Sequence, residues 1–180
     1  MKDVFEYLAK NHDKHLEELK DFLRIPSIST SEEAKPDIAR AAEFVAKQLK
    51  AIGMNNVQIN PTKGHPVVTG EWLGAKGAPT ALIYGHYDVQ PPDPLDLWKT
   101  PPFEPTLRDG KIFARGSADD KGQVFIHMKV VEAYMKTRGA LPINVKFIVE
   151  GEEEIGSTNL ADFTTKHKKH LACDVILVPD

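Results

Sequence analysis

The stretch Thr80-Ala81-Leu82-Ile83-Tyr84-Gly85-His86-Tyr87-Asp88-Val89 joins an apolar run to two polar groups. The run Thr80–Tyr84 predicts a compact buried strand, and His86 and Asp88 follow where this strand ends. Because they are two residues apart in an extended segment, these two side chains can point the same way. A histidine with carboxylates at strand ends suits zinc and leaves a position open for water. The stretch therefore predicts one part of a metal site.

Three acidic stretches later in the chain also follow strand-like runs or open helices. They are Ala-Asp-Asp-Lys-Gly at Ala118–Gly122, Glu-Gly-Glu-Glu-Glu-Ile-Gly-Ser at Glu150–Ser157, and Val-Pro-Asp at Val178–Asp180. A carboxylate has two oxygens, so Asp119 can bridge two metal ions, although paired acids also suit a helix N-terminus. In the pair Glu153-Glu154, one carboxylate can bind metal while the other takes a proton from water. Glu152 is assigned to a solvated loop.

The order of the expected elements predicts an α/β fold, a three-layer domain with a mixed β-sheet flanked by helices. In such sheets, ligands bind beyond the carboxyl ends of the strands, where His86, Glu153, Glu154 and Asp180 are expected. Val175–Val178 is expected to be buried, and Ser157 is expected to cap the last helix. The expected helices are Val4–Leu23, Asp37–Ile52, Lys121–Arg138 and Thr158–His170; the expected strands are Val57–Ile59, Val67–Leu73, Thr80–Tyr84, Ile143–Val149 and Val175–Val178, with a hairpin at Thr106–Ala114.

Composition narrows the class of protein. The chain has 180 residues, 41% of them hydrophobic and 27% charged, which suits one domain with a real core. The net charge of −3, without a basic face, argues against nucleic acid as a partner. The single Cys173 excludes an intrachain disulfide framework. No apolar stretch suits a signal peptide or a membrane span, so the expected compartment is the cytoplasm.

Taken together, the motifs resemble the dinuclear zinc metallopeptidases. The fit is closest to the carnosinase-like cytosolic dipeptidases, which are related to aminoacylase, glutamate carboxypeptidase and succinyl-diaminopimelate desuccinylase. The resemblance covers nearly the whole chain. It is carried by Ile25–Ser27, Gly85–Pro91, Trp98, Pro102-Phe103, Arg108–Gly110, Arg115–Gly122 and Glu150–Ser157.

The resemblance implies a site for two divalent metal ions. His86 and Asp180 are expected to bind the first ion, Glu154 the second, and Asp119 both. Zinc is the expected metal, although manganese and cobalt also suit such ligands. Relatives also have a cis peptide bond after the bridging aspartate, here between Asp119 and Asp120.

The resemblance also implies a reaction, the hydrolysis of dipeptides or similar short amides. A metal-bound hydroxide attacks the carbonyl, and Glu153 is the general base that activates the water. Asp88 is expected to orient the imidazole of His86 from behind. A second reading is an N-acyl-amino-acid deacylase or desuccinylase that uses the same residues.

Relatives are longer than this chain and carry a lid or dimerisation domain, a further metal-binding histidine and substrate-binding groups. Residues 1–180 are therefore expected to be the N-terminal portion of a truncated catalytic domain whose full-length form is a homodimer. The isolated chain is then an incomplete enzyme. A third reading, from another class, makes it the non-catalytic half of a split enzyme.

Overall fold

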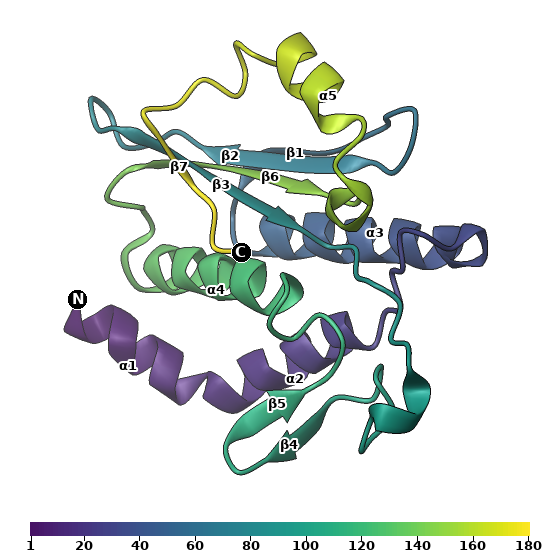
Figure 1. The fold of residues 1–180 in the computed structure, drawn as a ribbon. Helices are drawn as coiled ribbons and strands as arrows, with labels where there is room; N and C mark the ends of the chain where they lie inside the picture. Colours follow the sequence, from purple (N-terminus) through teal and green to yellow (C-terminus); the bar gives the residue numbers. More distant parts are fainter.

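The computed structural model describes residues 1–180 and centres on a five-stranded sheet (Figure 1). Its strands lie in the order β1-β2-β6-β3-β7. The β1–β2 and β2–β6 pairs are antiparallel, whereas β3 pairs in parallel with both β6 and β7, so the sheet is mixed as predicted. The strands are β1 (Asn55–Asn60), β2 (Val67–Trp72), β3 (Thr80–His86), β6 (Asn144–Glu150) and β7 (Val175–Leu177).

The parallel strands place the functional end of the sheet. Within β3, the side chains of Ala81, Leu82 and Ile83 are all buried, because this strand has a neighbour on each side and helices on each face. His86 ends β3 and lies in register with Glu150, the last residue of β6. Since parallel strands end at the same edge of a sheet, the segments that follow β3, β6 and β7 converge there.

Helices cover both faces of the sheet, which confirms the three-layer prediction (Figure 1). On one face, α3 and α4 pack against the larger hydrophobic cluster, which includes Val45, Met128 and Phe147. On the other face, α5 covers a smaller cluster that includes Leu82 and Phe163. The α-helices are α1 (Lys2–Lys10), α2 (His12–Leu23), α3 (Lys35–Ala51), α4 (Lys121–Arg138) and α5 (Leu160–Lys166). None of them combines the length and the hydropathy that a bilayer-spanning segment requires.

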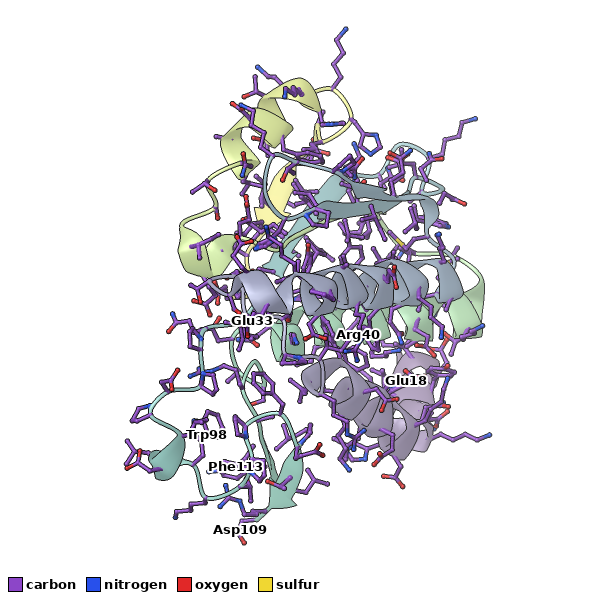
Figure 2. All side chains as sticks on the ribbon, turned by 90° about the vertical axis from the view of Figure 1, so that its right-hand side faces the viewer. Glu18, Glu33, Arg40, Trp98, Asp109 and Phe113 are labelled. Atoms are coloured by element: carbon purple, nitrogen blue, oxygen red, sulfur yellow. The ribbon has the colours of Figure 1, made fainter.

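A small hairpin projects from the main body, on the side of the molecule where Figure 2 labels Trp98, Phe113 and Asp109. It consists of β4 (Thr106–Arg108) and β5 (Lys111–Phe113), joined through Asp109 and Gly110, both of which have positive φ. The predicted hairpin is thereby confirmed. Three short 3-10 turns complete the fold: η1 (Glu32–Ala34), η2 (Leu95–Leu97) and η3 (Glu153–Ile155).

The prediction of one helix over Val4–Leu23 is wrong. The helix is interrupted at Asn11, which lies between α1 and α2 with φ −101° and ψ 10°. The Asn11 side chain donates a hydrogen bond of 2.9 Å to the carbonyl oxygen of Tyr7. An asparagine that bonds to the preceding turn competes with helix continuation, and the apolar periodicity alone does not reveal this.

Two further predictions are wrong near the C-terminus. Ser157 does not cap a helix: α5 begins only at Leu160, and the Ser157 hydroxyl donates 2.8 Å to the buried carboxylate of Glu150. The strand β7 forms but is exposed, with Ile176 57% and Leu177 41% accessible, because it is the edge of the sheet and no element covers it.

Candidate metal centre

Three of the predicted ligands lie together at the carboxyl end of the sheet. One ligand atom each from His86, Asp119 and Asp180 falls within 4.8 Å of the others. The Nε2 atom of His86 lies 3.1 Å from an Asp119 oxygen and 3.8 Å from an Asp180 oxygen. At these distances the three ligand atoms are close enough to bind one metal ion between them.

Each of the three side chains reaches this point from a different segment. His86 is the last residue of β3 and is fully buried. Asp119 lies between β5 and α4, at a cis peptide bond to Asp120 that agrees with the resemblance. Asp180 follows β7. The side chains of Asp119 and Asp180 are 51% and 31% exposed, so the group consists of a buried histidine below two partly exposed carboxylates, which we call the rim.

Asp88 lies behind His86, on the side away from the rim. Its carboxylate is fully buried, and its Oδ1 is 3.3 Å from the Nδ1 of His86. The backbone oxygen of Asp88 is also 3.1 Å from that Nδ1. A hydrogen bond at Nδ1 fixes the tautomer and leaves Nε2 free to accept a metal ion.

Glu153 and Glu154 lie in η3, and Asp88 also holds this turn. The backbone N–H groups of Glu153 and Glu154 donate to the two carboxylate oxygens of Asp88, at 3.3 and 3.1 Å. The Glu154 carboxylate lies outside the three-residue group and accepts a hydrogen bond of 2.6 Å from the Gln90 side chain. Its other oxygen, Oε1, is buried without a partner. The Glu153 side chain forms no hydrogen bond or ion pair.

The carboxylates at this site repel one another and favour positive charge among them. Burial alone would lower the pKa of His86, but hydrogen bonding and charge from Asp88, together with Asp120 and Asp119, raise that pKa to about 9. Burial, reinforced by the charges of Asp180 and Asp119, raises the pKa of Asp120 to about 6. Burial also raises the pKa of Glu154, and the hydrogen bond from Gln90 offsets part of the rise.

The donor set fits a divalent cation. Several carboxylates surround one imidazole, and the pKa of His86 is raised because they favour positive charge at this position. One nitrogen and several carboxylate oxygens are ligands that zinc accepts, with space left for water. The buried, unpartnered Oε1 of Glu154 is a further oxygen available to such a cation.

Comparison with known sequences agrees with this chemistry. The sequence model described as peptidase family M20/M25/M40 matches residues 82–179, which include every residue of the site described in this subsection except Asp180. The chain belongs to this peptidase family.

Individual M20-family relatives extend the comparison to nearly the whole chain. The Cys-Gly metallodipeptidase DUG1 of Candida albicans is 32% identical over 94% of this chain. The crystal structure of human carnosine dipeptidase 1 matches 98% of this chain with a TM-score of 0.92 at 31% identity. That of the M20 family metallo-carboxypeptidase Sso-CP2 of Sulfolobus solfataricus matches 92% with a TM-score of 0.84 at 38% identity. This chain spans only 37% to 40% of the length of these relatives.

Sequence reasoning missed three residues that lie at or beside this group of side chains. Asp120 is fully buried, and its Oδ2 accepts the backbone N–H of His86 at 3.0 Å. Gln90 binds Glu154, as described above, and its place directly after the His-Tyr-Asp-Val segment is the signal that could have found it. The assignment of Glu152 to a solvated loop is wrong, because its side chain is only 4% exposed. Three adjacent glutamates give no indication of which one turns inward.

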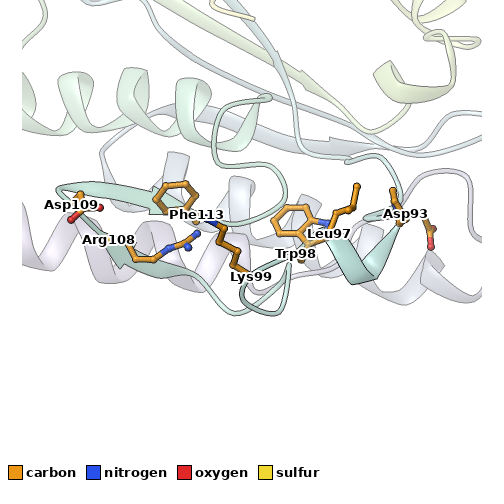
Figure 3. A pocket seen from close by; sticks show the side chains of 8 residues that line it. Asp93, Leu97, Trp98, Lys99, Arg108, Asp109 and Phe113 are labelled. Atoms are coloured by element: carbon orange, nitrogen blue, oxygen red, sulfur yellow. The ribbon is translucent and has the colours of Figure 1, made fainter.

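A cavity lies apart from the candidate metal centre. It has a volume of about 570 Å³ and lies between the η2 loop and the β4–β5 hairpin (Figure 3). Trp98 and Phe113 face it together with the cations Lys99 and Arg108, but Asp93 and Asp109 line it as well. With both signs of charge on its wall, the cavity does not indicate one class of ligand.

Proposed function

We propose that this chain forms the metal-binding part of a dipeptidase-type metallohydrolase that cleaves dipeptides or similar short amides. The observation that carries the proposal is the convergence of His86, Asp119 and Asp180 within 4.8 Å, beside the turn that holds Glu153. Membership of the M20/M25/M40 peptidase family and the names of the similar dipeptidases support it.

In this proposal, the chain holds two divalent cations, with zinc as the first choice and manganese or cobalt as other candidates. His86 and Asp180 would hold one ion, Glu154 the other, and Asp119 both. Such cations supply a nucleophile from water near neutral pH and polarise the scissile carbonyl. The unpartnered Oε1 of Glu154 and the carboxylates around His86 are the features that support this set.

The remaining roles concern protons and orientation. Asp88 holds the Nδ1 side of the His86 ring and so presents Nε2 to the rim. Glu153 accepts a proton from the attacking water and returns it to the leaving amine. Its side chain has no partner to compete for that proton. Asp88 fixes the backbone beneath Glu153 through a 3.3 Å hydrogen bond.

This chain covers 38% of the Candida albicans relative and 40% of the human one, so the substrate class is proposed from the names of these relatives alone. Dipeptides are the proposed substrates because both of these relatives are named as dipeptidases. An N-acyl-amino-acid deacylase would use the same metal ligands. The alternative of a non-catalytic half predicts activity only when a separate C-terminal polypeptide is added.

The first experiment is metal stoichiometry, measured by elemental analysis after zinc loading and desalting. We expect about two zinc ions per chain and fewer in Glu154→Gln. Turnover is then tested on a panel of dipeptides and N-acyl amino acids, with and without a separate C-terminal polypeptide. Glu153→Gln should abolish any turnover and leave metal content unchanged. Zinc retention close to zero, or full activity in Glu153→Gln, would contradict the proposal.

A further inference from the structure

The carboxylate of Glu152 is buried and is the centre of a hydrogen-bond cluster. Its Oε1 accepts the backbone N–H of His65 at 3.1 Å, and its Oε2 accepts the backbone N–H of Asn159 at 3.1 Å. The Asn159 side-chain amide donates to both oxygens at 3.0 Å. A buried carboxylate that accepts four such hydrogen bonds is well satisfied, and it links the segments that supply the donors.

These donors come from two segments that flank η3. His65 lies in the connection between β1 and β2, and Asn159 lies directly before α5. Gly64 makes the approach possible, because a Cβ atom at this position would lie 1.7 Å from Oε1 of Glu152. The backbone oxygen of Glu152 also accepts the N–H of Ser157 at 2.7 Å. Glu152 therefore ties the turn to the β1–β2 connection on one side and to the start of α5 on the other.

The same turn is held from its inner side by Asp88, which accepts the backbone N–H groups of Glu153 and Glu154. We propose that Glu152 is a positioning residue that, with Asp88, fixes the η3 turn so that the Glu153 and Glu154 side chains reach the metal centre. This inference rests on the proposed function, in which Glu153 moves the proton and Glu154 binds metal.

The physical reason is the small size of η3. A three-residue 3-10 turn has few hydrogen bonds of its own, so its orientation depends on hydrogen bonds to neighbouring side chains. If the Glu152 carboxylate loses its hydrogen bonds to His65 and Asn159, the turn can rotate about its contacts with Asp88. The Glu154 carboxylate then leaves the position from which it faces the site, whereas His86, Asp119 and Asp180, which come from other segments, stay in place.

The test uses the full chain and compares two variants, each of which lacks one buried carboxylate. Glu152→Gln keeps the shape of the side chain but turns an N–H₂ group toward the donors of Asn159 and His65. Glu132→Gln is the matched control, because Glu132 is also 4% exposed but lies in α4 and bonds to Lys129 and Tyr7. Zinc affinity is measured by competition with a chromogenic chelator at a temperature where circular dichroism shows every variant folded.

We expect Glu152→Gln to weaken the binding of the second zinc equivalent about tenfold or more and to leave the first unchanged. Glu132→Gln should bind both equivalents like the unaltered chain, although it is also destabilised. If Glu152→Gln loses stability but binds both equivalents normally, Glu152 is merely structural and the inference is overturned.

A second variant perturbs the carboxylate without removing it. Gly64→Ala should displace the Glu152 side chain and reproduce the loss of the second equivalent. Hydrogen-exchange mass spectrometry of the metal-free protein gives an independent readout, in which Glu152→Gln should speed exchange of the amides of residues 153–159. If the unaltered chain binds no zinc, the proposed function fails, and the exchange result alone decides on Glu152. Unchanged exchange in that segment would then overturn the inference.

Discussion

Asp88 lies 3.3 Å from His86, measured from carboxylate Oδ1 to imidazole Nδ1, and both side chains are fully buried. The pair links the end of β3 to the η3 turn, because the same carboxylate accepts two backbone N–H groups of that turn. One buried side chain thus orients the imidazole and also supports the backbone of Glu153 and Glu154.

The first prediction concerns this double role. Asp88→Asn replaces one acceptor oxygen by an N–H₂ group that must face either the imidazole or a backbone N–H. Because an outer partner of a metal-binding histidine sets its tautomer, we expect zinc affinity to fall about 10- to 100-fold. Chelator competition measures the change. Asp109→Asn, at an exposed turn of the hairpin, is the control and should leave zinc affinity unaltered. Equal affinities for the two variants would exclude the orienting role.

The second prediction concerns Gly85, the residue before His86. A Cβ atom at Gly85 would lie 2.6 Å from Oδ2 of Asp120, the oxygen that accepts the His86 N–H, and 3.0 Å from the Val124 side chain. Gly85→Ala should therefore destabilise the fold by about 1–3 kcal/mol, since overpacking a filled core forces its neighbours to move. Thermal unfolding should show a drop in Tm of several degrees.

A double-mutant cycle tests the cause of that loss. In an Asp120→Ala background the added methyl group gains space, so Gly85→Ala should cost clearly less there than in the unaltered chain. Additive losses would mean that Asp120 is not the group that Gly85 accommodates, and that the contact with Val124 decides instead.

The third prediction concerns acid stability, through a polar network far from the metal centre. Burial would raise the pKa of Glu132, but hydrogen bonds from Lys129 (2.7 Å) and Tyr7 (2.9 Å) outweigh burial and lower this pKa from 4.5 to about 2. Below pH 4.5 the unfolded chain takes up a proton at this position that the folded chain does not. The contribution of Glu132 is therefore fully present above pH 4.5 and is lost as the pH falls toward 2. The groups of this network come from four helices: Tyr7, Lys14, His15, Glu18, Gln48 and Lys129.

Urea unfolding at pH 6 and pH 3 tests this assignment. The loss of unfolding free energy between the two pH values should be smaller in Glu132→Gln by about 1–2 kcal/mol, after allowance for solvent screening. Glu33→Gln makes the same chemical change at an exposed position and should leave the difference as it is. If Glu132→Gln loses as much stability on acidification as the unaltered chain, other carboxylates carry the acid sensitivity.

Much of the fold could be predicted from local pattern. The apolar run Thr80–Tyr84 and the β-branched run Ile143–Val149 correspond to β3 and β6, and the residues that end them lie at one edge of the sheet. The helix Lys121–Arg138 matches α4 to the residue, because its stop signal is local: Gly139 adopts φ 68° and its N–H donates to the Met135 carbonyl.

What could not be predicted depends on contacts between distant segments. Ser157 resembles a helix cap, but its hydroxyl donates to Glu150, the buried last residue of β6. Glu152 resembles its neighbours, yet its backbone partner His65 lies 87 residues away. The proximity of Asp180 to His86, by contrast, is expected from the sequence, and the parallel pairing of β3 and β7 produces it. The roles of the site residues stay predictions until metal binding is measured.

The last prediction concerns the open edge of the sheet. The β7 strand pairs only with β3, and its other side presents unpaired backbone groups beside Val175, Ile176 and Leu177, each more than 40% exposed. An apolar, exposed edge strand is a template for pairing with another chain, so we expect the isolated chain to associate as its concentration rises. Ile176→Lys should weaken this association and change the free energy of unfolding by no more than about 0.5 kcal/mol.

Sedimentation velocity over a concentration series measures the effect, with Leu97→Lys as the control. Leu97 is 75% exposed, but it lies in η2, away from the sheet edge, so the same change of side chain there should leave association unaltered. A chain that stays monomeric over the whole series, or a Leu97→Lys variant that dissociates as readily as Ile176→Lys, would show that β7 does not mediate association. In the second case exposed apolar side chains in general, rather than the unpaired backbone of the edge, would be its cause.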